Sequence, residues 1–320
     1  MNTTSPRYRL PTQHSHKPKQ ESLWLRSWRY VHWLSLDVAL GAALSAEWVN
    51  YAWQGESSSW VSLAIMSASL WVYSLDHWAD ARQAAGKPSE QLSKRRLFYV
   101  NSQNILLSLS FVASIGGLWA AMHLPLKMII LGVCMLVVCV AYLWLIQRKQ
   151  EKKPLLNYPK EVIVTSVYAL ALSLWPLSQI LDANFSFNQQ LSYINGLLTS
   201  GLIFNFSWAN VCLISAHERR HDAAEDLPSM ALSLGEYTTK SIGRGLLKLS
   251  LLMCFARIYL QWAHLNTSSI SLLLDNGISL AMTFTLWRLY QRPEWSRAKE
   301  RYRRWADAVF LYPALLWFMF

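Results

Sequence analysis

A charged stretch directly after a long apolar run has the clearest chemical pattern in the sequence. It reads Ser215-Ala-His-Glu-Arg-Arg-His-Asp222. His217 and His221 are four residues apart, so they lie on one helix face, and with Glu218 as general base they match the HExxH pattern of zinc proteases. Glu218 and Asp222 are also four apart and suit a magnesium ion held through carboxylate oxygens. This stretch by itself leaves both chemistries open.

A second acidic pair occurs much earlier in the chain, in Tyr73-Ser-Leu-Asp-His-Trp-Ala-Asp80. Asp76 and Asp80 are one helical turn apart, so both carboxylates project from the same helix face. Like the later pair, they close a long apolar run. Charged groups at membrane depth are costly and are commonly functional or paired. We therefore expect both acidic pairs to act together.

The elements that carry these pairs are long apolar segments. Crossing a hydrocarbon layer of about 30 Å takes about 20 helical residues, and 53% of this chain is hydrophobic. Suitable segments recur nine times, which predicts an all-α, polytopic membrane protein with nine transmembrane helices. The predicted spans are Tyr30–Trp53, Trp60–Trp78, Leu97–Ala121, Met128–Ile146, Val162–Leu181, Leu191–Ala216, Leu246–Leu265, Ile270–Leu289 and Trp305–Phe320.

The distribution of charge supports these spans and orients them. Of the 30 Lys and Arg residues, 28 lie in the N-terminal region, in the loops after spans two, four, six and eight, or within three residues of those loops. The positive-inside rule places all these segments in the cytoplasm and the C-terminus on the outer side. We expect an integral protein of a bacterial inner membrane. The net charge of +11 then belongs to the membrane face rather than to nucleic acid.

Two regions are predicted from this pattern. Residues 1–29 form a basic, disordered cytoplasmic tail without the apolar stretch of a signal peptide, and residues 30–320 form one membrane domain. Both acidic pairs fall at the cytoplasmic ends of their spans, four spans apart. This equivalence indicates a remote internal duplication in which spans one to four match spans five to eight. Two facing pairs of carboxylates, flanked by basic residues, would suit Mg²⁺ ions that bridge to a diphosphate.

The zinc alternative needs a third ligand that leaves one coordination position open. Asp275, in Leu274-Asp-Asn-Gly, is one candidate, and Glu225 and Glu236 are others. Span eight begins on the outer side, however, so about 20 helical residues, roughly 30 Å, would separate Asp275 from the two histidines. In addition, Arg219 and Arg220 stand between His217 and His221, where zinc proteases usually carry buried, uncharged residues. The magnesium interpretation is favoured, and the zinc protease is the runner-up.

Nine spans with an acidic motif closing the second and the sixth resemble the UbiA superfamily of intramembrane prenyltransferases. The first family motif, N-D-x-x-D-x-x-x-D, falls on residues 72–80 and keeps Asp76 and Asp80, with Val72 and Tyr73 at its leading positions. The second motif, D-x-x-x-D followed by S-L or S-T, falls on residues 218–222 and on Ser229-Met230. Glutamate replaces the commoner aspartate at position 218. The resemblance covers most of the chain from Tyr30 onward.

The resemblance implies Mg²⁺-dependent transfer of a prenyl group from a prenyl diphosphate to a hydrophobic acceptor, which is aromatic, quinone-type or lipid. Asp76 and Asp80 would hold one ion, and Glu218 and Asp222 the second. The basic residues Lys94, Arg95, Arg96 and Lys160 would bind phosphate oxygens. Because the first motif is incomplete, a non-catalytic relative that binds lipid is a further hypothesis.

Three polar residues inside the spans have open roles. Asp37 either faces the same cavity or pairs with a neighbour, and Arg257 either reaches outward or pairs within the bundle. Asn210 lies two turns before Glu218, where it would line a substrate cavity or form an interhelical hydrogen bond.

Overall fold

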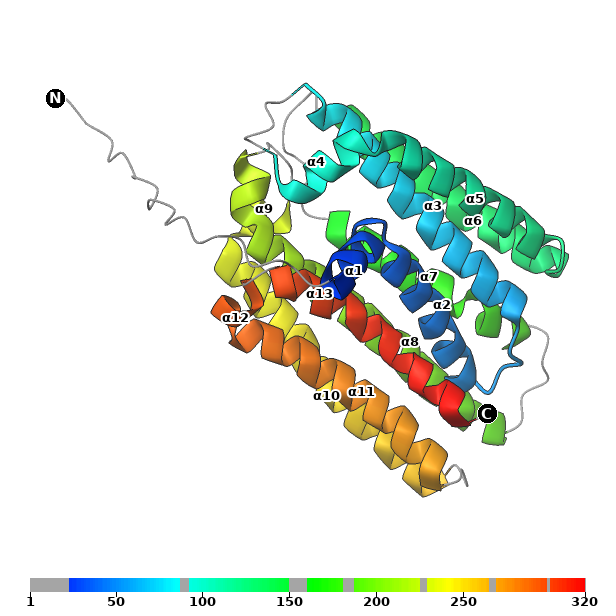
Figure 1. Ribbon diagram of the computed structural model, residues 1–320. Helices are drawn as coiled ribbons and strands as arrows, with labels where there is room; N and C mark the ends of the chain where they lie inside the picture. The colour runs from blue at the N-terminus through cyan, green and yellow to red at the C-terminus, as the bar shows by residue number, and fades with distance from the viewer. Residues whose placement is uncertain are drawn as a thin grey trace.

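The computed structural model describes residues 23–86, 92–149, 160–180, 187–224, 229–264, 269–297 and 300–319, and every regular element in these ranges is a helix (Figure 1). The elements are α1 (Leu23–Trp33), α2 (Leu36–Ala52), α3 (Ser59–Ala84), α4 (Lys94–Asn101), α5 (Gln103–Ala121), α6 (Leu126–Lys149), α7 (Lys160–Ile180), α8 (Phe187–Ala224), α9 (Met230–Leu234), α10 (Glu236–His264), α11 (Ser269–Gln291), α12 (Pro293–Arg297), α13 (Arg301–Ala308) and the 3₁₀ helix η3 (Val309–Met319). The all-α fold class is confirmed.

Three helical segments in the described part of the chain are long and apolar enough to cross a membrane. They are Gln103–Ala121, Val162–Gln179 and Tyr193–Ala224, and Leu126–Ala141 is a shorter apolar segment. Each of these segments falls within or overlaps a predicted span. The described parts of the other predicted spans also lie in helices, but these carry more polar residues or are shorter.

Two predicted spans are broken near the end where the acidic pairs lie. The first divides into α1 and α2 at Ser35, which takes a left-handed conformation with φ of 55°. Its hydroxyl bonds His77 Nε2 at 2.9 Å, so the break is tied to α3. The third divides into α4 and α5 at Ser102. Helix α1 also begins at Leu23, so residues 23–29, predicted as disordered tail, are helical.

The long helices form two similar halves. In the first, α3 packs closely along α5, and in the second, α8 packs along α10. A short helix precedes the third long helix of each half: α4 stands before α5 and α9 before α10. This matched order is what an internal duplication predicts. Helix α2 contacts α7 and α8 and so joins the halves.

The main core lies where α2 meets α7, α8, α11 and η3. Close approach depends on small residues, such as Ala42 and Ala46 of α2. Gly196 of α8 faces the indole of Trp53, which is 5% exposed, and an added Cβ there would overlap the ring. The C-terminal end of α2 therefore packs on α8 only because residue 196 lacks a side chain.

We expect Gly196→Ala to lower the free energy of unfolding by about 1–3 kcal/mol, because overpacking forces side chains and helices apart. Gly132→Ala in α6 is the matched control, since an added Cβ there meets nothing within 4 Å. Unfolding in detergent, followed by circular dichroism, measures both. Equal stability of the two variants would contradict the close packing.

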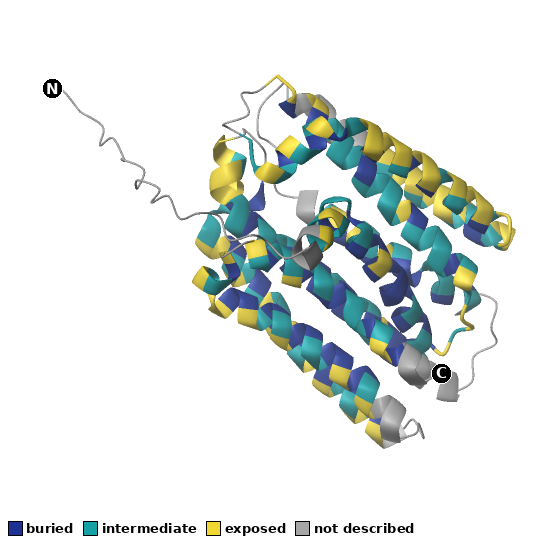
Figure 2. Cartoon of the chain, in the orientation of Figure 1, coloured by how far each residue is buried: buried dark blue, intermediate teal, exposed yellow. Residues whose placement is uncertain are grey.

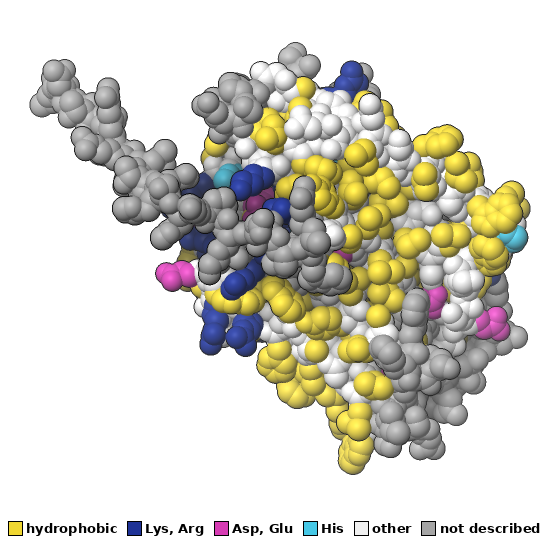
Figure 3. All heavy atoms as spheres, viewed as in Figure 1, with side chains coloured by type: hydrophobic (Ala, Val, Ile, Leu, Met, Phe, Trp, Pro, Cys, Tyr) yellow, Lys and Arg dark blue, Asp and Glu magenta, His cyan; other side chains and the backbone are white. Residues whose placement is uncertain are grey.

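Large apolar side chains cover much of the outer surface. Figure 2 shows many exposed positions along α5 and α6, and Figure 3 shows apolar side chains spread over the long helices. Phe111, Leu118 and Leu126 are 67%, 69% and 71% exposed, and Trp262 of α10 is 79% exposed. Water-soluble monomers rarely carry such extended apolar patches. This surface suits contact with lipid.

Candidate functional site

Short helices gather at one end of the bundle, where α3 and α8 also end. Helices α4, α9, α12 and α13 all lie there (Figure 1). Lys and Arg side chains collect at this end on the face that Figure 3 shows, whereas apolar side chains dominate the rest of that face. The acidic motifs therefore end in the basic part of the molecule.

Glu218 binds two segments that are distant in the sequence. Its Oε1 accepts hydrogen bonds from the Tyr302 hydroxyl at 2.9 Å and from Arg303 Nε at 3.0 Å. Its Oε2 accepts from Arg303 Nη2 at 2.8 Å and lies 3.6 Å from Arg95 Nη2. The Arg303 contact is a bidentate ion pair, which fixes both partners geometrically.

Helix α4 also contacts the Asp76–Asp80 pair, through Arg96, the residue that follows Arg95. Ser93 caps this helix and accepts a hydrogen bond from the backbone N–H of Arg96 at 3.4 Å. Arg96 Nη2 in turn lies 3.3 Å from Asp80 Oδ2. Consecutive arginines of α4 therefore contact the two acidic motifs: Arg95 contacts Glu218 of α8, and Arg96 contacts Asp80 of α3. We call this arrangement of Asp80, Arg96, Arg95 and Glu218 the arginine bridge.

The remaining two acids lie within electrostatic range of the bridge. Asp222 interacts with the charges of Glu218, Arg95 and Arg96. Tyr99, also on α4, interacts with Arg95 and Glu218 and with both Asp76 and Asp80. The fold thus brings both predicted pairs to one place, although they come from different halves.

Charge and burial set the protonation of the bridge. Burial acts to lower the pKa of Arg95, but Glu218 together with Tyr99, Tyr302 and Glu300 outweighs burial and raises the pKa, so the guanidinium stays charged. Burial and the Glu218 carboxylate raise the pKa of Tyr302 above its usual range, so the phenol remains a donor. Arg95 Nη1 is buried and makes no hydrogen bond with any group that the structure describes. A buried guanidinium nitrogen without an acceptor is costly and suits an anionic ligand.

Two of the four acids, Asp80 and Glu218, pair with arginines. Among the described residues, no three His, Cys, Asp or Glu groups lie close enough to hold a metal ion. Asp80 makes its contact with Arg96 through one oxygen, and its side chain is 34% exposed. Mg²⁺ in nucleotide and diphosphate sites uses one or two carboxylates together with water and phosphate oxygens. The four acids therefore suit a Mg²⁺ ion that binds together with a diphosphate.

The HExxH pattern has a structural role here. His217 Nδ1 lies 2.9 Å from the Leu213 carbonyl oxygen, and Nε2 lies 2.8 Å from Ser296 Oγ. Its ring also stacks on Tyr302 at a centroid distance of 4.6 Å. Both ring nitrogens are engaged inside the protein, so neither is directed at a metal.

We expect Zn²⁺ to leave the thermal unfolding temperature of the detergent-purified protein unchanged. The reason is that a zinc ion would have to displace the Ser296 hydroxyl from His217 Nε2 or the Leu213 carbonyl from Nδ1. Differential scanning fluorimetry with and without Zn²⁺, on the wild type and on His221→Ala, measures this. A zinc-dependent rise that disappears in His221→Ala would restore the protease hypothesis.

Three predicted substrate-binding residues have different surroundings. Lys94 is exposed at the start of α4. Lys160 begins α7, but its side chain is not among those that the structure describes. Asn210 does not contact the arginine bridge: its Nδ2 donates to Asp307 Oδ1 at 3.0 Å, which makes an interhelical hydrogen bond between α8 and α13.

Asn210 belongs to a second polar cluster deeper in the bundle. His32 Nδ1 lies 2.8 Å from Asp37 Oδ2 and 3.8 Å from Asp307 Oδ2. Asp37 therefore pairs with a neighbour, which was one of its two open roles. Arg95 is within electrostatic range of His32 and Asp307, so this cluster adjoins the arginine bridge.

The sequence did not single out Arg303, Tyr302, His32 or Asp307. One signal was available: Arg303 and Asp307 are four residues apart, so they share one face of α13. Their partners, however, are on α8 and α1 and could not be read from that spacing.

Arg257 also pairs within the bundle. It is fully buried and donates to Asn195 Oδ1 at 3.1 Å, Ser279 Oγ at 2.7 Å and Asp275 Oδ2 at 2.5 Å. Trp48 Nε1 donates to the other carboxylate oxygen of Asp275 at 2.6 Å. This network joins α2, α8, α10 and α11, so the candidate third zinc ligand is a structural acceptor.

No protein-family model, curated protein or solved structure matches this chain.

Proposed function

We propose that this protein is an intramembrane prenyltransferase related to the UbiA superfamily, and that its diphosphate donor binds at the arginine bridge. The observation that carries the proposal is the position of α4. It places Arg95 and Arg96 between acidic motifs from two halves of the chain, and Arg95 Nη1 has no acceptor among the described groups. A diphosphate would supply that acceptor, and the acids would balance the charge of the bound cations.

In this proposal Asp76 and Asp80 would hold one Mg²⁺ ion together with the donor, and Glu218 and Asp222 would lie near a second. Bound Mg²⁺ would offset the charge that develops on the leaving diphosphate. Glu218 must loosen its contacts with Arg303 and Arg95 to reach a metal. The freed guanidinium groups would then turn to phosphate oxygens, for which their planar fork is suited.

The reaction would begin when the allylic C–O bond breaks and the diphosphate leaves with the bonding electron pair. Arg95, Arg96 and Arg303 would stabilise that leaving charge in a low-dielectric setting, where such donors are most effective. A nucleophilic atom of the acceptor would then bond to the allylic cation. The proton that the acceptor loses would pass to a carboxylate of the acidic motifs.

The membrane arrangement belongs to the same proposal. Nine helical segments would cross a bacterial inner membrane, with the arginine bridge at the cytoplasmic face and the C-terminus outside. The three long apolar helices, the exposed apolar surface and the collection of basic side chains at one end support it. A hydrophobic acceptor, aromatic, quinone-type or lipid, would reach the site from the bilayer.

Thermal stabilisation by a donor tests the binding step. We expect farnesyl or geranylgeranyl diphosphate to raise the unfolding temperature of the purified protein only when Mg²⁺ is present, because binding to the folded state alone is stabilising. The response should vanish in Asp76→Ala and persist in His221→Ala. A wild-type protein that does not respond to either diphosphate with Mg²⁺ would refute the proposal and favour a non-catalytic lipid-binding relative.

A further inference from the structure

Helices α10 and α11 carry matched pairs of basic residues toward the end of the bundle that holds the arginine bridge. Arg244 and Lys248 lie four residues apart on α10. Arg288 and Arg292 lie four apart at the end of α11, where the Arg292 N–H still donates to the Arg288 carbonyl at 3.1 Å. Arg244 is half-buried and the other three are exposed. Like charges at this spacing share a helix face and repel each other, which destabilises the helix.

Contacts between α10 and α11 show that the two basic pairs occupy the same levels. Arg257 of α10 donates to Ser279 of α11 at 2.7 Å, and Cys254 Sγ lies 4.0 Å from Thr283 Oγ1. The helices therefore run antiparallel, and each step back along α10 corresponds to a step forward along α11. Continued toward the arginine bridge, this register sets the basic residues at two levels, one helical turn apart: Lys248 with Arg288, and Arg244 with Arg292. We call these four residues the basic quartet.

The basic quartet has no acidic partner among the described residues. No ion pair joins any of its four side chains to a described Asp or Glu. Glu236, at the start of α10, is already shared by Lys240 Nζ at 2.6 Å and Arg297 Nη2 at 3.2 Å. Arg288 lies over the Trp295 ring, 6.0 Å from its centroid. The positive charges of the quartet thus lack an ion-pair partner in the described chain.

Helix dipoles account for only half of the quartet. Basic residues in the last turn of a helix are stabilised by its dipole, which explains Arg288 and Arg292 at the end of α11. Arg244 and Lys248 lie inside α10, beyond its first turn, where the dipole gives a cation no such stabilisation. Glu294, exposed on the neighbouring α12, supplies a single negative charge. The remaining repulsion favours an anion from outside the chain.

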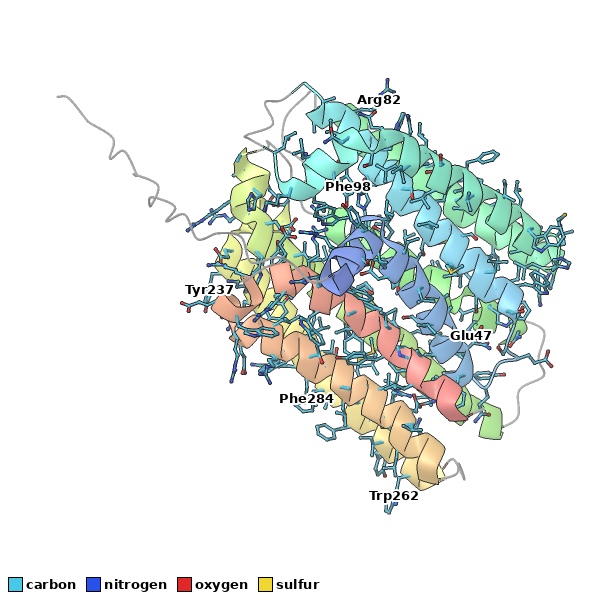
Figure 4. All side chains as sticks on the ribbon, viewed as in Figure 1. Glu47, Arg82, Phe98, Tyr237, Trp262 and Phe284 are labelled. Atoms are coloured by element: carbon cyan, nitrogen blue, oxygen red, sulfur yellow. The ribbon has the colours of Figure 1, made fainter. Side chains whose placement is uncertain are left out.

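The helix face that carries Lys248 continues as an exposed apolar strip toward the other end of the bundle. Steps of three and four residues keep the strip on one face of α10. Its side chains are 57–79% exposed: Leu252, Phe255, Tyr259 and Trp262. Phe284 of α11, one turn before Arg288, is 60% exposed. Figure 4 shows Phe284 and Trp262 on the same outer side of the α10–α11 pair, directed away from the bundle. Basic groups at one end of an apolar surface match the headgroup and acyl chains of an anionic phospholipid.

We propose that the basic quartet binds the headgroup of diphosphatidylglycerol, an anionic phospholipid with two phosphates, and that the apolar strip contacts its acyl chains. Basic sites between helices at the cytoplasmic side of a membrane suit such headgroups. The two levels of the quartet are four residues, about 6 Å, apart along the helices, so each level can bind one phosphate. A single phosphate would leave most of the quartet's charge unbalanced. The site uses no residue of the arginine bridge and does not rest on the proposed prenyl transfer.

Thermal unfolding of the delipidated full chain in detergent tests the site. We expect diphosphatidylglycerol to raise the unfolding temperature in a saturable way, and by more than phosphatidylglycerol at the same phosphate concentration. Phosphatidylcholine, which has no net charge, should leave it unchanged. The double variant Lys248→Gln with Arg288→Gln should lose the response to diphosphatidylglycerol. Arg219→Gln with Arg220→Gln is the matched control and should keep it, because it removes the same charge from exposed positions of α8.

Native mass spectrometry of the wild-type protein decides the matter even if the Lys248→Gln, Arg288→Gln variant does not fold. A single diphosphatidylglycerol retained per chain, in preference to phosphatidylglycerol, would support the site. Equal stabilisation by the two anionic lipids at the same phosphate concentration would overturn it. So would a response that persists in the Lys248→Gln, Arg288→Gln variant, a response lost equally in the α8 control, or the absence of retained diphosphatidylglycerol.

Discussion

Replacing Asp76 or Asp222 with alanine is expected to reduce prenyl transfer by about 100-fold to 1,000-fold, a loss typical of removing one electrostatic stabiliser of a transition state. Each variant should remain folded, because neither carboxylate belongs to the bidentate Glu218–Arg303 contact that joins α8 to α13. Transfer is measured with radiolabelled prenyl diphosphate and membrane-extracted acceptors, alongside thermal unfolding of each variant.

The control for these variants is Glu294→Ala. Glu294 is an exposed acid of α12 at the same end of the bundle, so its removal changes the net charge equally without touching either motif. It should keep wild-type transfer. Full activity in both Asp76→Ala and Asp222→Ala would show that the acidic motifs do not act in the reaction.

Replacing Arg257 with methionine is expected to destabilise the protein by about 3–5 kcal/mol, because it leaves the buried Asp275 carboxylate without its cation. Asp275 is 2% exposed and, among the described residues, would keep the Trp48 and Gln261 hydrogen bonds. Asp275→Leu should cost a similar amount, since it strands the fully buried guanidinium. Unfolding by SDS in mixed micelles gives the free energies.

The double variant Arg257→Met with Asp275→Leu should recover much of the loss, because replacing both members of a buried ion pair with apolar residues is often close to neutral. Lys248→Met, an exposed substitution on the same helix α10, is the matched control and should change stability by less than about 0.5 kcal/mol. Additive losses in the double variant would mean that the two side chains are not coupled.

The candidate site was only partly predictable. Two acidic pairs one turn apart were readable from spacing, and the structure brings them together around α4. The partner of Glu218 was not readable, because Arg303 lies 85 residues further along the chain. Similarly, HExxH has the spacing of a zinc site, yet His217 is bound to Ser296, 79 residues away. A local sequence pattern indicates which side chains share a helix face, but it does not predict which distant residues they contact.

The sequence by itself determined the helical class, the apolar segments and the concentration of basic residues between alternate segments, because these depend on composition and on the 3.6-residue period within each segment. Only the tertiary structure decided that α4 joins the two acidic motifs, that α13 binds Glu218, and that Arg257 is neutralised by Asp275. These contacts join residues far apart in the chain. They depend on how the helices pack and on which buried charges must be balanced, and neither is encoded in any single segment.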